Sequence, residues 1–98
     1  MFARVSTYQG GTEQLLDGFR RTLEPLAQLE GSERAYFLAD SSADRAVTVT
    51  LWDSQTAMAA SAEWASKTRE HAAHDSGAAV VSVRTYEVAL TAEKPALR

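Results

Sequence analysis

The stretch that decides the fold is VTVTLW at residues 47–52, followed by DS at residues 53–54 and by an alanine-rich run that ends at Gly77. The first six residues alternate along the chain and are rich in β-branched side chains, which is typical of a strand. Asp53 and Ser54 are good helix caps, because a short side-chain oxygen accepts hydrogen bonds from the first turn. From Gln55 the composition favours a helix, which Gly77 should end. We therefore predict that an inner strand turns tightly into a helix of about five turns.

Three further segments have the pattern of strands. They are residues 2–8, 35–38 and 79–90, in which β-branched and aromatic side chains are frequent. The polar residues 40–44 are turn-forming, which suits a hairpin loop between the second and third strands. The third of the four predicted strands is then the segment 47–52.

A first amphipathic helix should follow the turn at Gly10-Gly11, with Thr12 as its cap. Its apolar side chains recur at helical spacing: Leu15, Leu16, Phe19, Leu23 and Leu26. Pro25 lies inside this run, lacks an N–H group and clashes with the preceding turn. We therefore expect the helix to kink or end near residues 23–24.

The predicted order of elements is β-α-β-β-α-β. This order favours an α+β, ferredoxin-like sandwich, in which a four-stranded antiparallel sheet carries two helices on one face. Residues 1–90 should form a single domain, and residues 91–98 a C-terminal tail. The other face of the sheet would be uncovered, and its hydrophobic and aromatic side chains predict that a second copy of the chain covers it.

Composition and charge exclude several classes of function. The 98 residues carry ten Lys and Arg against thirteen Asp and Glu, a net charge of −3, and there is no basic cluster beyond Arg20-Arg21, which argues against nucleic acid as a partner. No apolar run is long enough to span a bilayer, and residues 1–30 lack the pattern of a secretory signal. The sequence has no cysteine, so disulfides and thiolate chemistry are absent. We expect a cytoplasmic protein with no membrane partner.

Residues 49–54, VTLWDS, followed by an alanine-rich helix that ends in a histidine, resemble the antibiotic biosynthesis monooxygenase (ABM) family. The Glu30-Gly31 turn stands where such proteins commonly carry a Pro-Gly turn. The resemblance covers roughly residues 1–90. It implies a dimeric α/β barrel, in which two sheets close face to face, and a pocket in each subunit between the sheet and the helices.

The resemblance implies two different activities. Quinone-forming members oxidise polycyclic aromatic phenols with O2 and without a metal or flavin. Haem-degrading members use an asparagine on the first strand, a tryptophan in the second helix and a histidine ligand late in that helix. Here Ser61 falls at the tryptophan position and His71 at the histidine position, and the sequence contains no asparagine, which some quinone-forming members also use.

The leading prediction is a cofactor-independent monooxygenase-like protein that acts on an aromatic small molecule of the polycyclic phenol or quinone type, in natural-product metabolism. No cofactor is expected. One alternative is a haem-binding or haem-degrading protein that uses His71. A second alternative is a non-catalytic, dimeric ligand-binding or accessory protein.

His71 is the predicted catalytic base, because an imidazole titrates near neutral pH. It shares a helical stripe with Trp64 and Thr68, so the cavity would have an aromatic wall, a hydroxyl group and one titratable group. This combination suits a planar phenolic ligand better than a charged or phosphorylated one. The predicted substrate-binding residues are Trp52, Trp64, Thr68, Ser61, Tyr36 and Tyr86.

A metal site is the weaker interpretation of the histidines. His71 and His74 lie three residues apart on the predicted helix and could share a metal with Asp75 or Glu70. Such spacing alone is a weak signal, and the sequence has no third histidine. No metal site is predicted.

Overall fold

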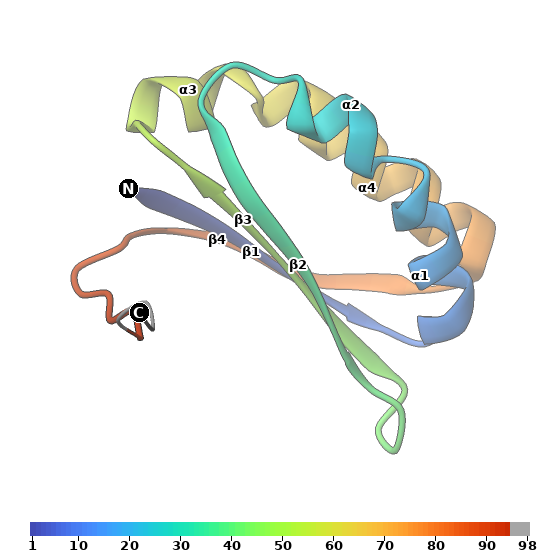
Figure 1. Ribbon diagram of the computed structural model, residues 1–98. Coiled ribbons are helices and arrows are strands. Elements are labelled where there is room, and N and C mark those ends of the chain that lie inside the picture. The colour runs from blue at the N-terminus through green and yellow to red at the C-terminus, as the bar shows by residue number, and fades with distance from the viewer. Residues whose placement is uncertain (95–98) are drawn as a thin grey trace.

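The computed structural model describes residues 1–94, which form a four-stranded antiparallel sheet with all helices on one face (Figure 1). The strands lie side by side in the order β2-β3-β1-β4. The elements are β1 (Phe2–Gln9), α1 (Thr12–Arg20), α2 (Leu23–Ala27), β2 (Ser32–Asp40), β3 (Arg45–Trp52), α3 (Gln55–Ala60), α4 (Ala62–Ser76) and β4 (Ala79–Glu87). The predicted ferredoxin-like α+β class is confirmed, although each predicted helix is divided in two.

The helical segment that follows β3 begins at the Ser54 cap and ends at Gly77, as predicted. The Ser54 hydroxyl accepts a hydrogen bond from the Ala57 N–H group at 3.1 Å and so caps α3. Gly77 ends α4 in the left-handed conformation, with φ of 73°. The tight turn from β3 into the helix layer is therefore encoded locally.

The single five-turn helix predicted here is wrong, because the helix is interrupted at Ser61. The Ser61 hydroxyl donates to the carbonyl oxygen of Met58 at 2.7 Å, and the guanidinium group of Arg4 donates to the same oxygen, also at 2.7 Å. A serine bound back to the preceding turn competes with the helical hydrogen-bonding pattern. A contact from β1 that the local sequence does not reveal thus separates α3 from α4.

The first predicted helix is also divided, but earlier than expected. α1 ends at Arg20, and Pro25 lies in the first turn of α2, where its missing N–H group costs no helical hydrogen bond. The N-terminus of α1 differs too, because Gly11 and not Thr12 is the cap residue. The Thr12 N–H group donates to the Asp44 carboxylate at 3.1 Å, so the loop between β2 and β3 caps α1.

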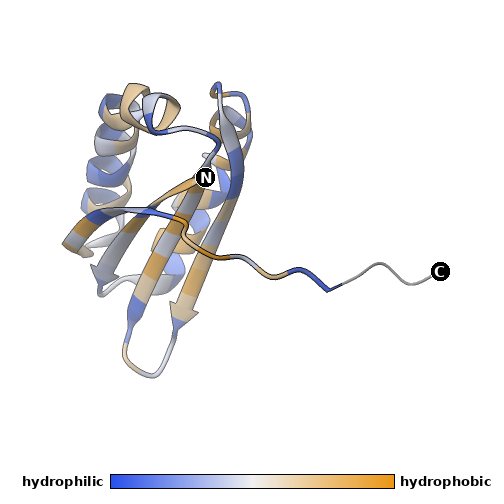
Figure 2. Ribbon diagram, turned by 90° about the vertical axis from the view of Figure 1, so that its left-hand side faces the viewer, coloured by the Kyte–Doolittle hydropathy of each residue, from blue (hydrophilic) through white to orange (hydrophobic). Residues whose placement is uncertain are grey.

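The two faces of the sheet carry different side chains. We call the side beneath the helices the covered face; its central residues are Arg4, Ser6, Tyr8, Phe37, Thr48, Thr50 and Trp52. We call the opposite side the open face; its residues are Ala3, Val5, Thr7, Tyr36, Leu38, Val47, Val49, Leu51, Ser82, Arg84 and Tyr86. The assignment follows from strand register, which pairs Val5 with Val49 and Ser6 with Thr48. Figure 2 shows hydrophobic segments on neighbouring strands of the sheet.

The packed core lies at one end of the covered face. Tyr8, Leu15 and Ala46 are fully buried there, and Phe19 and Phe37 pack against them. The Phe19 ring lies 5.6 Å from the Tyr8 ring and 5.8 Å from the Phe37 ring, measured between centroids. This cluster joins α1 to the sheet.

The chain after β4 has no regular secondary structure as far as residue 94. The Val88 N–H group donates to the Met1 carbonyl oxygen at 2.9 Å, which ties the start of this segment to the start of β1. Residues 95–98 of the predicted tail lie outside the described residues. Within residues 1–94, no helix has the length and apolar character needed to cross a membrane.

Candidate ligand cavity

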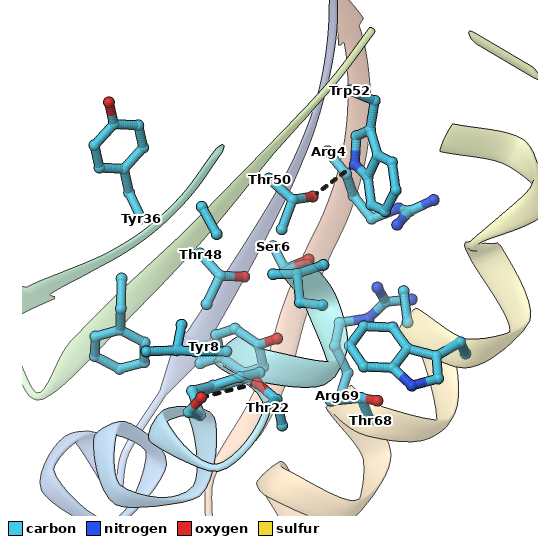
Figure 3. Close-up of a pocket in the computed structure, with 17 residues that line it drawn as sticks. Arg4, Ser6, Tyr8, Thr22, Tyr36, Thr48, Thr50, Trp52, Thr68 and Arg69 are labelled. Carbon is cyan, nitrogen blue, oxygen red and sulfur yellow. Dashed lines mark hydrogen bonds between the residues drawn. The ribbon is translucent and has the colours of Figure 1, made fainter. Parts of the chain in front are cut away.

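A cavity lies between the covered face and the helices, next to the packed core (Figure 3). Its walls are largely aromatic and aliphatic. The sheet contributes Trp52 and Phe37, and the helices contribute Trp64, Phe19, Leu23 and Leu26. Both tryptophans of the chain therefore line one cavity, which suits a flat apolar ligand.

Hydroxyl groups of Ser6, Thr48 and Thr50 line the sheet side of the cavity, and that of Thr68 lines the helix side. Thr50 has a structural role as well, because its hydroxyl accepts a hydrogen bond from the indole N–H group of Trp52 at 3.0 Å. The Trp52 ring is fully buried, so this bond satisfies a donor that water cannot reach. Thr48 makes no such bond within residues 1–94.

Arg4 places a positive charge against the cavity. Its side chain is only 6% exposed, lies over the Trp52 ring at 5.8 Å, and donates to the Met58 carbonyl oxygen and, at 3.1 Å, to the Ser61 hydroxyl. Burial is the main reason that the pKa of this guanidinium is lowered. All of these contacts are with neutral groups.

Arg69 of α4 is a second cation at the same cavity. After burial, its charge is the next cause of the lowered pKa of Arg4. Neither arginine forms an ion pair with a carboxylate within the described part of the chain, and no aspartate or glutamate lines the cavity. The cavity is therefore positive, although the protein as a whole is negative.

Tyr8 adds a buried hydroxyl group. It makes no hydrogen bond within residues 1–94, although Thr48 and Ser6 are its neighbours. Burial raises the pKa of this phenol, and the adjacent hydroxyl groups and the charge of Arg69 offset the rise only in part. Tyr8 is therefore protonated at neutral pH and can donate to a ligand.

The structure brings together three of the predicted substrate-binding residues, since Trp52, Trp64 and Thr68 all line the cavity. Ser61 is buried but does not line it; its hydroxyl holds Arg4. Tyr36 borders the cavity, but its ring points away from the other lining residues (Figure 3). Tyr86 lies on the open face, paired in register with Ala3, and does not reach the cavity.

The predicted placement of His71 is wrong. Its side chain is exposed on α4 and does not line the cavity. The position follows from helical geometry: α4 lines the cavity with Trp64, Ala65, Thr68 and Arg69, so its cavity-facing direction lies between Ala65 and Thr68, and His71 is about 90° around the helix from that direction. At this position His71 cannot act as a base on a ligand in the cavity.

His74 is also exposed, 3.5 Å from the Asp75 carboxylate, and residues 1–94 hold no side-chain cluster suited to a metal ion.

The sequence interpretation missed Arg4, Tyr8 and Arg69 as cavity residues. The shared parity of Arg4, Ser6 and Tyr8 on the first strand was the available signal. Using it requires knowing which face the helices cover. The apolar face Val5, Val47 and Val49 would be the ordinary choice for burial, and the structure uses the other one.

Comparisons with known proteins identify the fold. No protein-family model and no curated protein matches the sequence. Among solved structures, a protein from Deinococcus radiodurans provisionally assigned as an antibiotic biosynthesis monooxygenase is 14% identical, with a TM-score of 0.77 over 98% of this chain and 100% of that one. SnoaB, a cofactor-independent oxygenase from Streptomyces nogalater, is 15% identical, with a TM-score of 0.75 over 95% of this chain and 97% of that one.

A variant of MhuD with two manganese protoporphyrin IX molecules bound per active site is similar too. It is 20% identical, with a TM-score of 0.68 over 96% of this chain and 100% of that one. Proteins of this fold thus include a cofactor-independent oxygenase and a porphyrin-binding protein. At these identities the likeness concerns the fold, and the chain has the fold of the antibiotic biosynthesis monooxygenases.

Proposed function

We propose that this protein is a cofactor-independent monooxygenase-like enzyme that acts in the cytoplasm, in natural-product metabolism, on an aromatic small molecule of the polycyclic phenol or quinone type. The observation that carries the proposal is the cavity under the helix layer. Its walls include Trp52 and Trp64, and its hydroxyl groups can fix the orientation of a ring. The fold shared with SnoaB supports the reaction class as an analogy.

The proposed reaction converts a phenol to a quinone. One oxygen atom of O2 replaces a ring hydrogen and becomes the new carbonyl oxygen. The other leaves as water, together with that ring hydrogen and the phenolic proton, and the substrate supplies all of the electrons. The protein's contribution is to exclude water, to orient the ring between the tryptophans and to stabilise the electron-rich phenolate that reacts with O2.

The mouth of the cavity must move to admit such a ligand. The cavity volume is about 70 Å³, well below the several hundred Å³ that ligand sites usually offer. Leu23 of α2 lines the cavity and is 55% exposed, so its side chain can swing outward at little cost. We therefore place entry beneath α2.

Haem fits this cavity poorly. Haem iron is held in proteins by a histidine, cysteine, methionine or tyrosine. Among residues 1–94, Tyr8 alone points such a side chain into the cavity, and its raised pKa keeps it neutral. His71 lies outside the cavity. The haem alternative therefore lacks a ligand here, although MhuD shows that the fold accommodates a porphyrin.

A non-catalytic binding protein is the second candidate, because the described residues that line the cavity include no histidine, aspartate or glutamate. General acid–base catalysis is most effective with such a group. The catalytic proposal therefore requires the substrate to ionise by electrostatic stabilisation alone.

We further propose that two copies pair through their open faces into a barrel. The open face exposes large apolar side chains, including Leu38 and Tyr86, each about half exposed, and faces of this kind are usually covered. The pairing would leave the cavity on the outer, helix-covered side of each sheet.

Oxygen consumption with a polycyclic phenol tests the proposed function. Wild type should consume one O2 per phenol and form the quinone, with an 18O label from O2 in the product. Trp64→Ala should weaken substrate binding, whereas His71→Ala should retain wild-type turnover. Binding without oxygen consumption across a panel of phenols would contradict the enzyme and favour the binding protein. A tight hemin complex lost in His71→Ala would contradict our assignment of the cavity.

A further inference from the structure

We propose that Arg4, Arg69 and the Tyr8 hydroxyl form a subsite for an anionic oxygen of the aromatic ligand. This inference rests on the aromatic cavity of the proposed function and names the class of molecule that it takes: an aromatic carboxylate or phenolate. It replaces the sequence-based expectation of an uncharged phenolic ligand.

The first support is the buried charge of Arg4. A guanidinium group has five N–H donors, and the Met58 carbonyl and the Ser61 hydroxyl engage only two of its nitrogen atoms. Burying an ion without a counter-charge is costly, and the described residues supply no carboxylate to this one. Met58 and Ser61 hold the guanidinium at the cavity wall, where a ligand anion would provide the missing charge.

The second support is the convergence of Arg69 on the same place. Arg4, Tyr8 and Arg69 all line the one cavity (Figure 3), and the positive charge of Arg69 contributes to the pKa shifts of the other two. Two like charges repel each other across a poorly solvated cavity. An anion bound between them would remove that repulsion, so the two arginines together favour a negatively charged ligand.

The third support is the Tyr8 hydroxyl, a fully buried donor that makes no hydrogen bond of good geometry with the described residues, although the hydroxyl groups of Thr48 and Ser6 are its neighbours. Such groups are rare in native proteins and call for an explanation. An anionic oxygen held by Arg4 and Arg69 would accept this hydrogen bond as well. Charge-assisted bonds of this kind are about twice as strong as neutral ones.

Long-range attraction does not explain the arrangement. The chain has a net charge of −3, and the outer surface of α4 alternates in sign, with Lys67 bound to Glu63 at 3.3 Å in an exposed ion pair. Within the cavity lining, by contrast, Arg4 and Arg69 face no described carboxylate. Lys67→Gln is therefore a matched control, because it removes one positive charge from the same helix, outside the cavity.

The test is isothermal titration calorimetry with 2-naphthoate and 2-naphthamide, which share one ring system and differ in charge. Wild type should bind the carboxylate roughly 10- to 100-fold more tightly than the amide, because hydrogen bonds to charged groups contribute about 1.5–3 kcal/mol. Arg69→Gln should lower affinity for the carboxylate about tenfold and leave affinity for the amide unchanged. Tyr8→Phe should have a smaller effect in the same direction, and Lys67→Gln none.

A third ligand, 2-naphthol, shows whether the subsite binds phenolates as well as carboxylates. Bound 2-naphthol should show the red-shifted absorbance of the naphtholate at a pH at which the free compound is neutral, and Arg69→Gln should abolish the shift. Tight binding of naphthoate without this shift assigns the subsite to carboxylates.

Equal affinity for naphthoate and naphthamide would overturn the anionic subsite and leave the aromatic cavity standing. Equal losses of affinity for naphthoate in Arg69→Gln and Lys67→Gln would overturn it too, because the overall charge of the protein would then explain the preference for the carboxylate. Failure of all three compounds to bind would overturn the aromatic cavity itself. Arg4→Met is the second variant for the subsite, with circular dichroism as the check that it folds.

Discussion

The two faces of the sheet differ from those of an ordinary half-buried sheet. The face beneath the helices carries Arg4, Ser6, Thr48 and Thr50 around Trp52, whereas the face without a cover carries Val5, Val47, Val49 and Leu51. In most antiparallel sheets the hydrophobic side packs on the core and the polar side meets water. Here the buried side combines polar groups with the aromatic residues Tyr8, Phe37 and Trp52.

The difference separates two tasks. Tyr8, Leu15 and Ala46 provide a packed core at one end of the covered face, which frees the rest of that face for polar groups that a ligand can use. The open face has no chemistry of this kind and offers mainly contact area. We infer that one face binds a ligand and the other binds a second copy of the chain.

The largest expected effect is on the open face. Val49 lies at its centre, paired with Val5 on one side and Tyr36 on the other. Val49→Asp would bury an uncompensated carboxylate in each half of the proposed dimer, at a cost of about 3 kcal/mol or more. Sedimentation should show that the dissociation constant of the dimer rises by at least ~10²-fold, so that the variant is largely monomeric.

Two variants serve as controls for this effect. Thr56→Asp makes the same charge change on the exposed surface of α3 and should leave the dimer intact, and Val49→Thr keeps the shape and strand propensity and should weaken it only slightly. If Val49→Asp remains a folded dimer, the open face is not the interface.

An intermediate effect should distinguish two threonines of the covered face. Thr50 accepts a hydrogen bond from the indole N–H group of Trp52, and Thr48, on the same strand and face, has no equivalent bond within residues 1–94. Thr50→Val leaves a buried donor unsatisfied and should lower the free energy of unfolding by about 1–3 kcal/mol. Thr48→Val should change it by less than about 0.5 kcal/mol.

Urea denaturation of both variants measures this difference, with equal m-values as the sign that neither changes the unfolded state. Equal stability of the two variants would show that the indole bond contributes nothing and that the polar groups of this face are interchangeable.

The smallest effect concerns Tyr8. Its hydroxyl has no hydrogen bond of good geometry within residues 1–94. The free energy of unfolding of Tyr8→Phe at neutral pH should therefore equal that of wild type or exceed it by up to about 1 kcal/mol. Because the pKa of this phenol is raised in the folded protein, its protonated form favours folding. That contribution is complete below the unfolded pKa of about 10 and is lost as the pH rises through the folded value.

Unfolding curves between neutral pH and pH values above about 10 check this sign. Wild type should lose more stability than Tyr8→Phe over that range. An equal or larger loss in the variant would mean that burial does not raise the pKa of the Tyr8 phenol in the folded protein.

Much of the fold could be predicted from local signals, and the errors have identifiable physical causes. Alternation gave the strands, and Ser54 and Gly77 correctly marked the ends of the second helical segment. The division of that segment at Ser61 depends on Arg4, 57 residues away in the sequence, and no local pattern contains it.

The site was less predictable for a related reason. Helical spacing correctly brought Trp64 and Thr68 into the cavity, but extended the stripe one step too far, to His71. Alternation along the first strand places Arg4 and Tyr8 on the same face of the sheet. It does not indicate which face the helices cover. Hydrophobicity points to the valine face, because the sequence alone does not distinguish burial by helices from burial by another subunit.

The most direct test of the division between the faces is the 15N spectrum of the two indole N–H groups during titration with 2-naphthoate. Both tryptophans line the cavity, and the open face carries none. We predict saturable shifts of the Trp52 and Trp64 indole signals, with no change in the side-chain methyl signals of Leu38, Val47 and Leu51, which point to the open face. Shifts confined to those open-face residues, with both indole signals unmoved, would contradict the account.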